Sequence, residues 1–169
     1  IGGFGGRDLD YSTGKIFLGG GGGGGHQNDN EGGDGGDGGG MILINCFGTL
    51  SGTGQLNANG EDGEGSEGAT AGFGDLANTD GSGGGGSGGT VVINSPTNVT
   101  GVTINANGGA GGDQRIDVGP FASEGEAEGP GGGGGGGYIA ISNGTPNRTT
   151  NGGANGETNS PYVSNFPAN

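Results

Sequence analysis

Basic residues are scarce in this chain: four lysines and arginines stand against 18 aspartates and glutamates among 169 residues, a formal net charge of −14. A surface of this sign repels phosphate, so we expect no nucleic-acid partner and no attraction to anionic membranes. No apolar stretch approaches the roughly 20 residues of a membrane helix, so we expect no membrane insertion. The few basic residues are also scattered, which argues against an enzyme of the β-helix lyase type. We expect no catalytic site.

Cysteine and proline are rare as well. Cys46 is the single cysteine, so an internal disulfide cannot form, and its alternation with Ile42 and Ile44 predicts a buried, inert thiol. Glycine reaches 54 residues, the level of collagen, but six prolines and the absence of a Gly-X-Y period exclude collagen. We interpret the chain, which begins at Ile1 without a visible signal peptide, as a mature product or a segment of a larger protein. The acidic, lysine-poor composition favours an extracellular or cell-surface location.

The low hydrophobic content of 25% and the high charge are typical of disorder, but the apolar residues are not scattered. They gather in the short runs Met41–Asn45, Thr90–Asn94 and Tyr138–Ser142, whose starts lie about 48 residues apart. A second motif follows at a fixed distance, at Leu56–Gly60 and Ile104–Gly108. Two motifs that recur in the same order indicate an internal repeat.

The third copy of this second motif is predicted at Gly153–Gly156, and Lys15–Leu18 is interpreted as a shortened N-terminal copy of the first. Both faces of Met41–Phe47 carry apolar residues, which predicts a strand covered on both sides. Such units cannot bury an apolar face alone and are expected to stack. The sequence therefore predicts an all-β fold, a repetitive β-solenoid or sandwich of units of about 48 residues. The predicted domain spans residues 1–141, with units near 15–40, 41–89 and 90–137 and a partial unit at 138–156, followed by an extended Asn/Thr/Pro-rich tail at 142–169.

Glycine runs accompany these strands, notably Gly19–Gly25 and Gly131–Gly137. Glycine loses more backbone entropy on ordering than any other residue, so long runs become ordered only if their packing compensates. Polyglycine II helices, which have three residues per turn, can pack backbone against backbone and exchange amide hydrogen bonds. We predict such packed segments. Disordered loops are the alternative, and the excursions Glu61–Gly81 and Asp113–Gly129 fit that alternative better than the long runs do.

The order of motifs resembles a known group of proteins. Lys15-Ile-Phe-Leu18 with its glycine run and His26-Gln-Asn, then Met41-Ile-Leu-Ile44, Leu56-Asn-Ala-Asn-Gly60 and Thr90-Val-Val-Ile-Asn94, resemble glycine-rich modules of large Bacteroidetes cell-surface proteins. Those are exported by the type IX system and include gliding-associated, adhesin-like proteins. The resemblance covers residues 10–141 and implies an exported, repetitive, surface or fibre-forming protein without catalytic residues. The packed-glycine architecture is also similar to that of phage tail-tip adhesins and a small antifreeze protein. The tail has no counterpart in the resemblance.

Carboxylates spaced three residues apart suggest a cation site. At three residues per turn Glu31, Asp34 and Asp37 share one edge, and they are the candidate ligands of a structural calcium ion. The stretch approaches the calcium-binding β-roll repeat, but Gly39 stands where that repeat has an apolar residue. The alternative is a solvated acidic face that keeps the protein soluble. We expect no other cofactor.

Other candidate residues have simpler interpretations. His26 is predicted to be a loop histidine that bonds locally, because no second histidine accompanies it. The aromatic residues Tyr11, Phe17, Phe47 and Tyr138 mostly flank glycine runs, where we expect them to cover bare backbone. Asn-x-Ser/Thr sequons mark three asparagines as glycosylation sites, relevant only if the source is eukaryotic: Asn98, Asn143 and Asn147.

These features favour a structural component of an extracellular fibre, stalk or surface adhesin. We expect it to form a homo-oligomer or filament through its strand edges, with the tail available as a donated strand. A monomeric module that binds surface glycans or proteins through Glu61–Asp80 and Asp113–Gly129 is the main alternative. An ice-binding protein is a further one, because Thr97, Thr100 and Thr103 would line one side of an extended strand.

Overall fold

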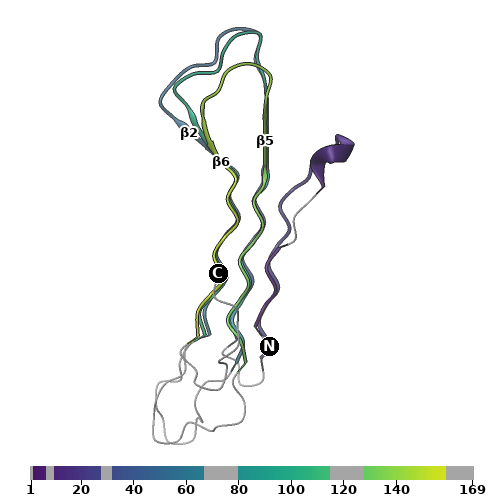
Figure 1. Ribbon diagram of the computed structural model, residues 1–169, viewed down its shortest axis with the longest axis vertical. Helices are drawn as coiled ribbons and strands as arrows, with labels where there is room; N and C mark the ends of the chain where they lie inside the picture. Colours follow the sequence, from purple (N-terminus) through teal and green to yellow (C-terminus); the bar gives the residue numbers. More distant parts are fainter. Residues whose placement is uncertain (1, 7–9, 28–31, 67–79, 115–127, 159–169) are drawn as a thin grey trace, which may run out of the picture.

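The structure, a computed structural model, describes residues 2–6, 10–27, 32–66, 80–114 and 128–158 (Figure 1). Within these ranges the regular structure is almost entirely β-strand, which confirms the predicted all-β class. The exception is a single 3-10 turn, η1, at Tyr11–Thr13. Nothing in the described ranges forms a helix with the length and apolar character needed to cross a membrane.

Six short strands form two open sheets in the described part of the chain. The first sheet has the order β1-β3-β5 and the second the order β2-β4-β6, and all neighbouring strands are parallel. Their bounds are β1 Met41–Asn45, β2 Gln55–Asn57, β3 Thr90–Asn94, β4 Thr103–Asn105, β5 Tyr138–Ile141 and β6 Asn147–Thr149. The three apolar runs predicted to be strands are thus confirmed as β1, β3 and β5, side by side.

Sequence-equivalent residues pair across each sheet. Ile44 pairs with Ile93, which pairs with Ile141, and in the second sheet Leu56 pairs with Ile104. The core lies between the two sheets and is centred on the middle strands, where Val91, Ile93 and Ile104 are at most 1% exposed. Burying each of these side chains stabilises the fold by roughly 1.5–3 kcal/mol.

The opposite face of the first sheet is more open than the sequence suggested. Leu43 lies at the middle of β1 and is 60% exposed, and Phe47 beyond the end of β1 is 90% exposed. The prediction that apolar residues on both faces mean cover on both faces is therefore wrong for this part of the strand. The physical reason is that the printed contacts of the N-terminal segment with this sheet are to the first residues of β3 and β5, where Phe17 accepts a hydrogen bond from Thr90 and Tyr11 stacks on Tyr138.

Residues 142–158 lie within the fold, although the sequence analysis assigned them to an extended tail as well as, up to residue 156, to a partial repeat unit. β6 pairs in register with β4, so that Asn105 is opposite Thr149. The separation between paired residues drops from 48 to 44 here, because the connection 142–146 is shorter than its counterpart 95–102. The residues that stand beside the motif Ile104–Gly108 in the third layer are consequently Arg148–Gly152, and not Gly153–Gly156 as predicted. The remaining tail, 159–169, lies outside the described residues.

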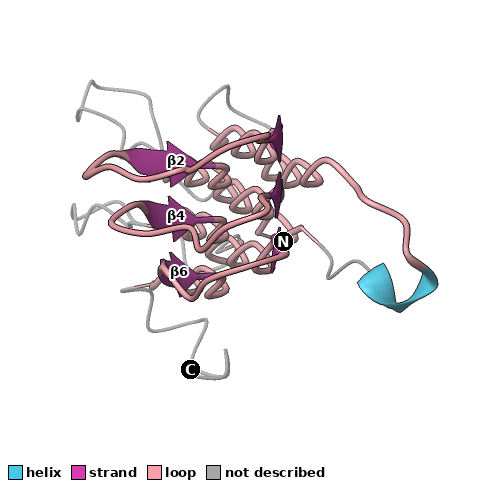
Figure 2. Cartoon of the chain, turned by 90° about the horizontal axis from the view of Figure 1, so that it is seen from above, coloured by secondary structure: helices cyan, strands magenta, loops and turns pink. Residues whose placement is uncertain are grey.

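Glycine-rich segments continue each strand away from the core. We call the chain through β1 and β2 the first layer, through β3 and β4 the second, and through β5 and β6 the third; Figure 2 shows the three layers stacked. Each layer has an inner segment leading into its first strand and an outer segment leaving its second. The inner segments are 32–40, 81–89 and 129–137, and the outer segments are 58–66, 106–114 and 151–158. Residues 2–6 and 19–25 form an additional N-terminal row.

Candidate functional site: the faces of the glycine bundle

The inner segment 81–89 lies at the centre of the bundle and is buried at every position. Its backbone donors follow a period of three. Gly83, Gly86 and Gly89 donate to the first outer segment, at Glu64, Glu61 and Ala58, over 2.7–2.8 Å. Gly84 and Ser87 donate to the N-terminal row, and Gly85 and Gly88 donate to the third inner segment. Three successive residues therefore donate hydrogen bonds to three different neighbouring segments.

The backbone acceptors of 81–89 complete the set of neighbours. Its carbonyls accept hydrogen bonds from Gly33, Gly36 and Gly39 in the first layer, from Gly109 and Gly112 in the second outer segment, and from Gly3 and Gly6 in the N-terminal row. Six segments thus surround one segment that carries only two serine side chains. The hydrogen-bonded packing of glycine runs expected from the sequence is present, and both Glu61–Ser66 and Gly81–Gly89 belong to it.

Space explains why most of these positions are glycine. A Cβ on Gly83 or Gly86 would lie under 3.0 Å from the carbonyl oxygen of Asp34 or Asp37, a separation that real Cβ atoms essentially never show. A Cβ on Gly109 or Gly112 would collide in the same way with the carbonyl oxygens of Glu61 and Glu64. The second layer must therefore have glycine, which lacks a Cβ, at the positions where its backbone contacts the first layer. The third layer has glycine for the same reason where it contacts the second.

The first layer carries side chains at these same positions. Asp34, Asp37, Glu61 and Glu64 are all exposed, because no described segment covers them. We call these four residues the acidic end. Glu61 also accepts a hydrogen bond from the Asp37 backbone N–H through Oε2, at 3.4 Å. This N–H is equivalent to that of Gly86, which in the second layer donates to a carbonyl of the preceding layer.

The acidic end contains two of the three predicted calcium ligands. Asp34 and Asp37 share one edge, as the three-residue period requires, while Glu31 lies outside the described residues. Within the ranges that the structure covers, no three His, Cys, Asp or Glu side chains are arranged so that they could hold a metal ion. Calcium binding stays a prediction. Sequence reasoning missed Glu61 and Glu64, although comparing them with the equivalent Gly109 and Gly112 would have found them.

The third layer ends differently. Arg148 of β6 stands in register with Ile104 of β4, so an exposed cation occupies the position of a core side chain. In the first two layers Gly33 and Ser82 donate their N–H to the next layer, but the equivalent residue of the third layer is Pro130, which has no N–H. Gly133 donates its N–H to Asn155 Oδ1 at 3.0 Å. A further layer would accept hydrogen bonds from backbone N–H groups at these two positions. In the third layer, however, Pro130 has no N–H, and the N–H of Gly133 is already bonded to a side chain.

Amide side chains link the layers along the outer segments. Asn105 donates to Asn57 at 2.8 Å and accepts from Thr149 at 2.9 Å. Two residues further on, Asn59 accepts from the backbone of Asn107, and Asn107 accepts from that of Asn151. These ladders hold neighbouring layers in one register, which is a structural role and needs no ligand.

Three further sequence predictions need correction. His26 does not bond locally, because its Nδ1 contacts Oε1 of Glu128, 102 residues away in the sequence. Cys46 is half-buried and its thiol donates to the carbonyl of Gly48 at 3.4 Å, so it is free but not buried. Among the aromatic residues, Tyr11 stacks on Tyr138 and meets the edge of Phe17. Phe47, at 90% exposed, does not cover backbone as expected.

The three threonines considered for ice binding do not share one extended strand. Gly101 adopts a positive φ of 76° between Thr100 and Thr103, and Thr97 lies in a bend and donates to Gly48. A straight row cannot pass through such a turn. The sequon asparagines Asn98, Asn143 and Asn147 are all exposed on the connections beyond the sheets or at the start of β6.

The loops proposed for receptor binding lie mostly outside the described residues, at 67–79 and 115–127. Next to them, an open hollow of about 580 Å³ lies between the first two outer segments and is lined largely by glycine, Asp62, Glu64, Ser66 and Asp113. At the base of the bundle Ser66 pairs with Gln114, and Gln114 with Thr158. Ser66 Oγ and Gln114 Nε2 are buried without a hydrogen-bond partner among the described residues.

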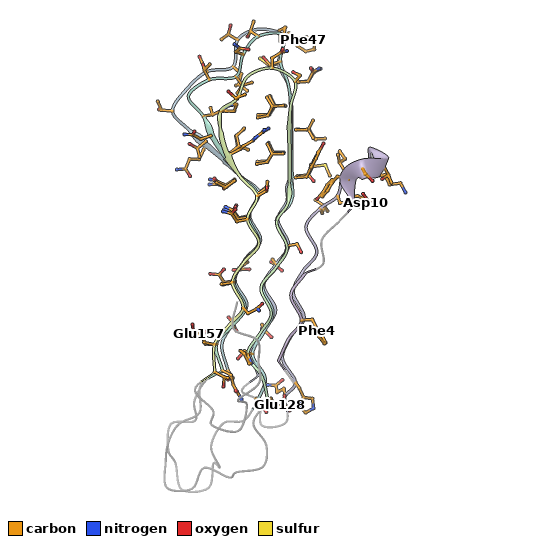
Figure 3. All side chains as sticks on the ribbon, in the orientation of Figure 1. Phe4, Asp10, Phe47, Glu128 and Glu157 are labelled. Carbon is orange, nitrogen blue, oxygen red and sulfur yellow. The ribbon has the colours of Figure 1, made fainter. Side chains whose placement is uncertain are left out.

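Large apolar side chains are exposed at the N-terminal row. Figure 3 shows Phe4 pointing away from the other segments, and it is 79% exposed; Leu18, just before the row's second segment, is 62% exposed. In the same row, Gly20, Gly21 and Gly24 have room for a side chain. Around Gly20 a Cβ would meet nothing within 4 Å, and around Gly21 and Gly24 its nearest neighbours would lie at 3.6 and 3.9 Å.

Comparison of the chain with protein-family models, curated protein sequences and solved structures found no match.

Proposed function

We propose that this chain is a rigid structural module of an extracellular stalk or surface adhesin. In this proposal the three layers are stacked units of a β-solenoid, and the glycine segments are packed polyglycine II helices. One observation supports it above all: segment 81–89 is buried along its whole length and hydrogen-bonded to six neighbouring segments, with a period of three residues.

The physical argument concerns the cost of ordering glycine. Fixing the backbone of one residue costs about 1–2 kcal/mol, and glycine has the most freedom to lose. An arrangement in which every third N–H of a segment bonds the same neighbour offsets that cost by backbone contacts alone. Such a bundle offers no side chains for chemistry in its interior. We expect the bundle to be stiff, a property that suits a spacer or a support.

The repeat pattern alone suggests that a filament could grow by adding further layers, but the residues at both ends of the stack disfavour such growth. A layer stacked on the acidic end would meet Asp34, Asp37, Glu61 and Glu64 where the existing layers have glycine. A layer stacked on the third would find Pro130 and an already bonded Gly133. We therefore propose a module of defined length, exported to the cell surface as the resemblance to Bacteroidetes proteins implies.

The alternative function is recognition of a surface glycan or protein. The described residues that flank the excursions, Ser66 with Asp80 and Gln114 with Glu128, lie at one end of the bundle, because Ser66 pairs with Gln114 and donates its N–H to Ser82 Oγ. A stiff support that presents two excursions at one end is suited to adhesion. Strong, specific hits on a glycan array would favour this alternative over a purely structural role.

Force spectroscopy tests the structural proposal. The chain would be held between two handles fused to its ends and stretched. We expect a resisting plateau and a cooperative rupture, because the bonds of 81–89 break together. The matched control is the same chain with Gly83 and Gly86 both changed to Ala, which should extend at low force. Wild-type chain that extends smoothly at low force, as a flexible Gly-rich linker does, would contradict the proposal.

A further inference from the structure

The N-terminal row contains glycines that the packing of its own chain does not require. In segment 19–25, Gly19, Gly22 and Gly25 face backbone so closely that a Cβ would collide. Gly20, Gly21 and Gly24 face open space, and none of them has a positive φ that would exclude a side chain. Leu18 shares the edge of Gly21 and Gly24 at the three-residue period, and its large side chain is accommodated there.

The other exposed edges of the bundle are occupied by side chains. Asp34 and Asp37 stand on the first inner segment, Asn59 and Asp62 on the first outer segment, and Ala154 and Asn155 on the third, all exposed. Open glycines elsewhere in the segments occur singly, at Gly40 and Gly152. The run at 19–25 is therefore exceptional in being bare on its outer side as well as on its inner side.

The N-terminal row itself carries no charge, and apolar side chains are exposed on it. Residues 2–6 and 19–25 contain no ionisable side chain, in a chain of net charge −14. Phe4 and Leu18 project from it, 79% and 62% exposed. Two copies of so acidic a chain repel each other through most of their surfaces, so a neutral, apolar face is where they can approach.

We infer that this face, formed by Phe4, Leu18, Gly20, Gly21 and Gly24, docks the same face of a second copy of the chain. Opposite Gly20, Gly21 and Gly24 the partner must itself present glycine, because backbone-to-backbone packing in this bundle leaves no room for a Cβ between segments. The exposed Phe4 and Leu18 of each copy then pack beside this glycine contact. Among the described edges of the bundle, only this face offers such a surface. The contact is symmetric, since identical faces meet.

Within the chain, glycine segments pack against each other in both parallel and antiparallel orientation, so the relative orientation of two segments does not restrict such a contact. Segment 19–25 runs antiparallel to 32–40, with Gly19, Gly22 and Gly25 donating to Gly39, Gly36 and Gly33. Segments 32–40 and 81–89 run parallel and are bonded equally well. A two-fold axis that brings one N-terminal row against another thus creates contacts of a kind already present. The inference rests on the glycine packing of the proposed function and adds the partner.

Sedimentation of the wild-type chain from micromolar to millimolar concentration tests the inference. We expect a monomer–dimer equilibrium that Gly21→Glu shifts at least about tenfold towards monomer, since it places a charge on the face at a position with room for a side chain. Ala154→Glu is the control: it adds the same charge on an exposed position of the third outer segment and should leave the dimer unchanged. Wild type that stays monomeric throughout, or a dimer unaffected by Gly21→Glu, would overturn the inference.

A second measurement locates the contact. Gly24→Cys in a Cys46→Ser background should form an inter-chain disulfide under mild oxidation, whereas Ala154→Cys in the same background should not. Hydrogen exchange at 81–89, measured on the same samples, separates the two proposals. Protected amides with no dimer remove only the docking inference, while unprotected amides remove the packed bundle itself.

Discussion

The carbonyl oxygen of Asp34 lies only 1.8 Å from the place that a Cβ on Gly83 would occupy, and the two residues hold equivalent positions in adjacent layers. Asp34 keeps its side chain because no described segment covers it, and Gly83 has none because Asp34 lies against it. The same relation holds for Asp37 with Gly86. Carboxylates in one unit and glycines at the equivalent positions of the next therefore indicate which layer lies at the uncovered end of the stack.

Substituting a contact glycine should be far more damaging than substituting an open one. Gly86→Ala would drive a methyl group into the backbone of Asp37, which cannot move aside, so we expect a loss of about 3 kcal/mol in the free energy of unfolding. Gly20→Ala meets open space and should stabilise by about 0.4–1 kcal/mol, through a less flexible unfolded chain. Chemical denaturation of dilute protein measures both. Equal effects would mean that the glycine segments are not packed as described.

The apolar core should respond according to burial and not to residue type. Ile93 is 1% exposed between the two sheets, and Ile93→Ala should cost about 2–5 kcal/mol through lost contacts and an internal cavity. Leu43 is on the neighbouring strand but 60% exposed, and Leu43→Ala should cost about 0.5 kcal/mol or less. Thermal unfolding of the two variants checks this. A larger loss for Leu43→Ala would show that the outer face of the first sheet is covered.

Removing the charge from the edge strand β6 should promote association. Arg148→Leu would place an apolar side chain in register with Ile104 and Leu56, on a strand whose outer edge is unpaired among the described residues. Exposed, apolar strand edges recruit further strands, and charged residues prevent this. We expect concentration-dependent aggregates in light scattering. Arg148→Lys, which retains the charge, should stay as dispersed as wild type.

The turn η1 should loosen in acid. The Ser12 hydroxyl, and secondly its backbone N–H, donate to Asp10 and hold the pKa of that carboxyl below its ordinary value of 3.8. A lowered pKa means that the carboxylate supports the turn above pH 3.8, and that this support is lost as the pH falls through the lowered value. The amide resonance of Ser12 should follow this titration, and in Asp10→Asn it should not. Because Asp10 is exposed, global stability should scarcely change.

The strands could be predicted because apolar residues recur at fixed distances, and Met41, Thr90 and Tyr138 do begin paired strands. The third copy of the second motif was misplaced because β6 is polar: Asn147-Arg-Thr149 has no apolar signal, and its shorter connection shifts the register. The sequence also cannot reveal which edge of a bare glycine run faces inward, since glycines are identical. Only the fold distinguishes Gly22, which faces backbone, from Gly21, which does not.

Contact between His26 and Glu128 escaped prediction for a related reason. The two residues lie 102 positions apart and are brought together only because separate glycine segments end side by side. The acidic end, in contrast, carries a partial signal in the sequence. Its residues Glu61 and Glu64 interrupt a motif that continues with glycine in the next unit, and that difference has a direct steric meaning.

The scarcity of side chains along the described glycine segments, visible in Figure 3, affects how long such a protein survives in the presence of proteases. A protease binds the side chains that flank the scissile bond, and it needs a stretch of chain that is locally unfolded. Segment 81–89 offers neither, since it is buried, nearly bare and held on all sides. Trypsin finds only Lys15 and Arg148 among the described residues, both outside the glycine segments. We therefore expect the described glycine segments to resist trypsin, with cleavage outside them.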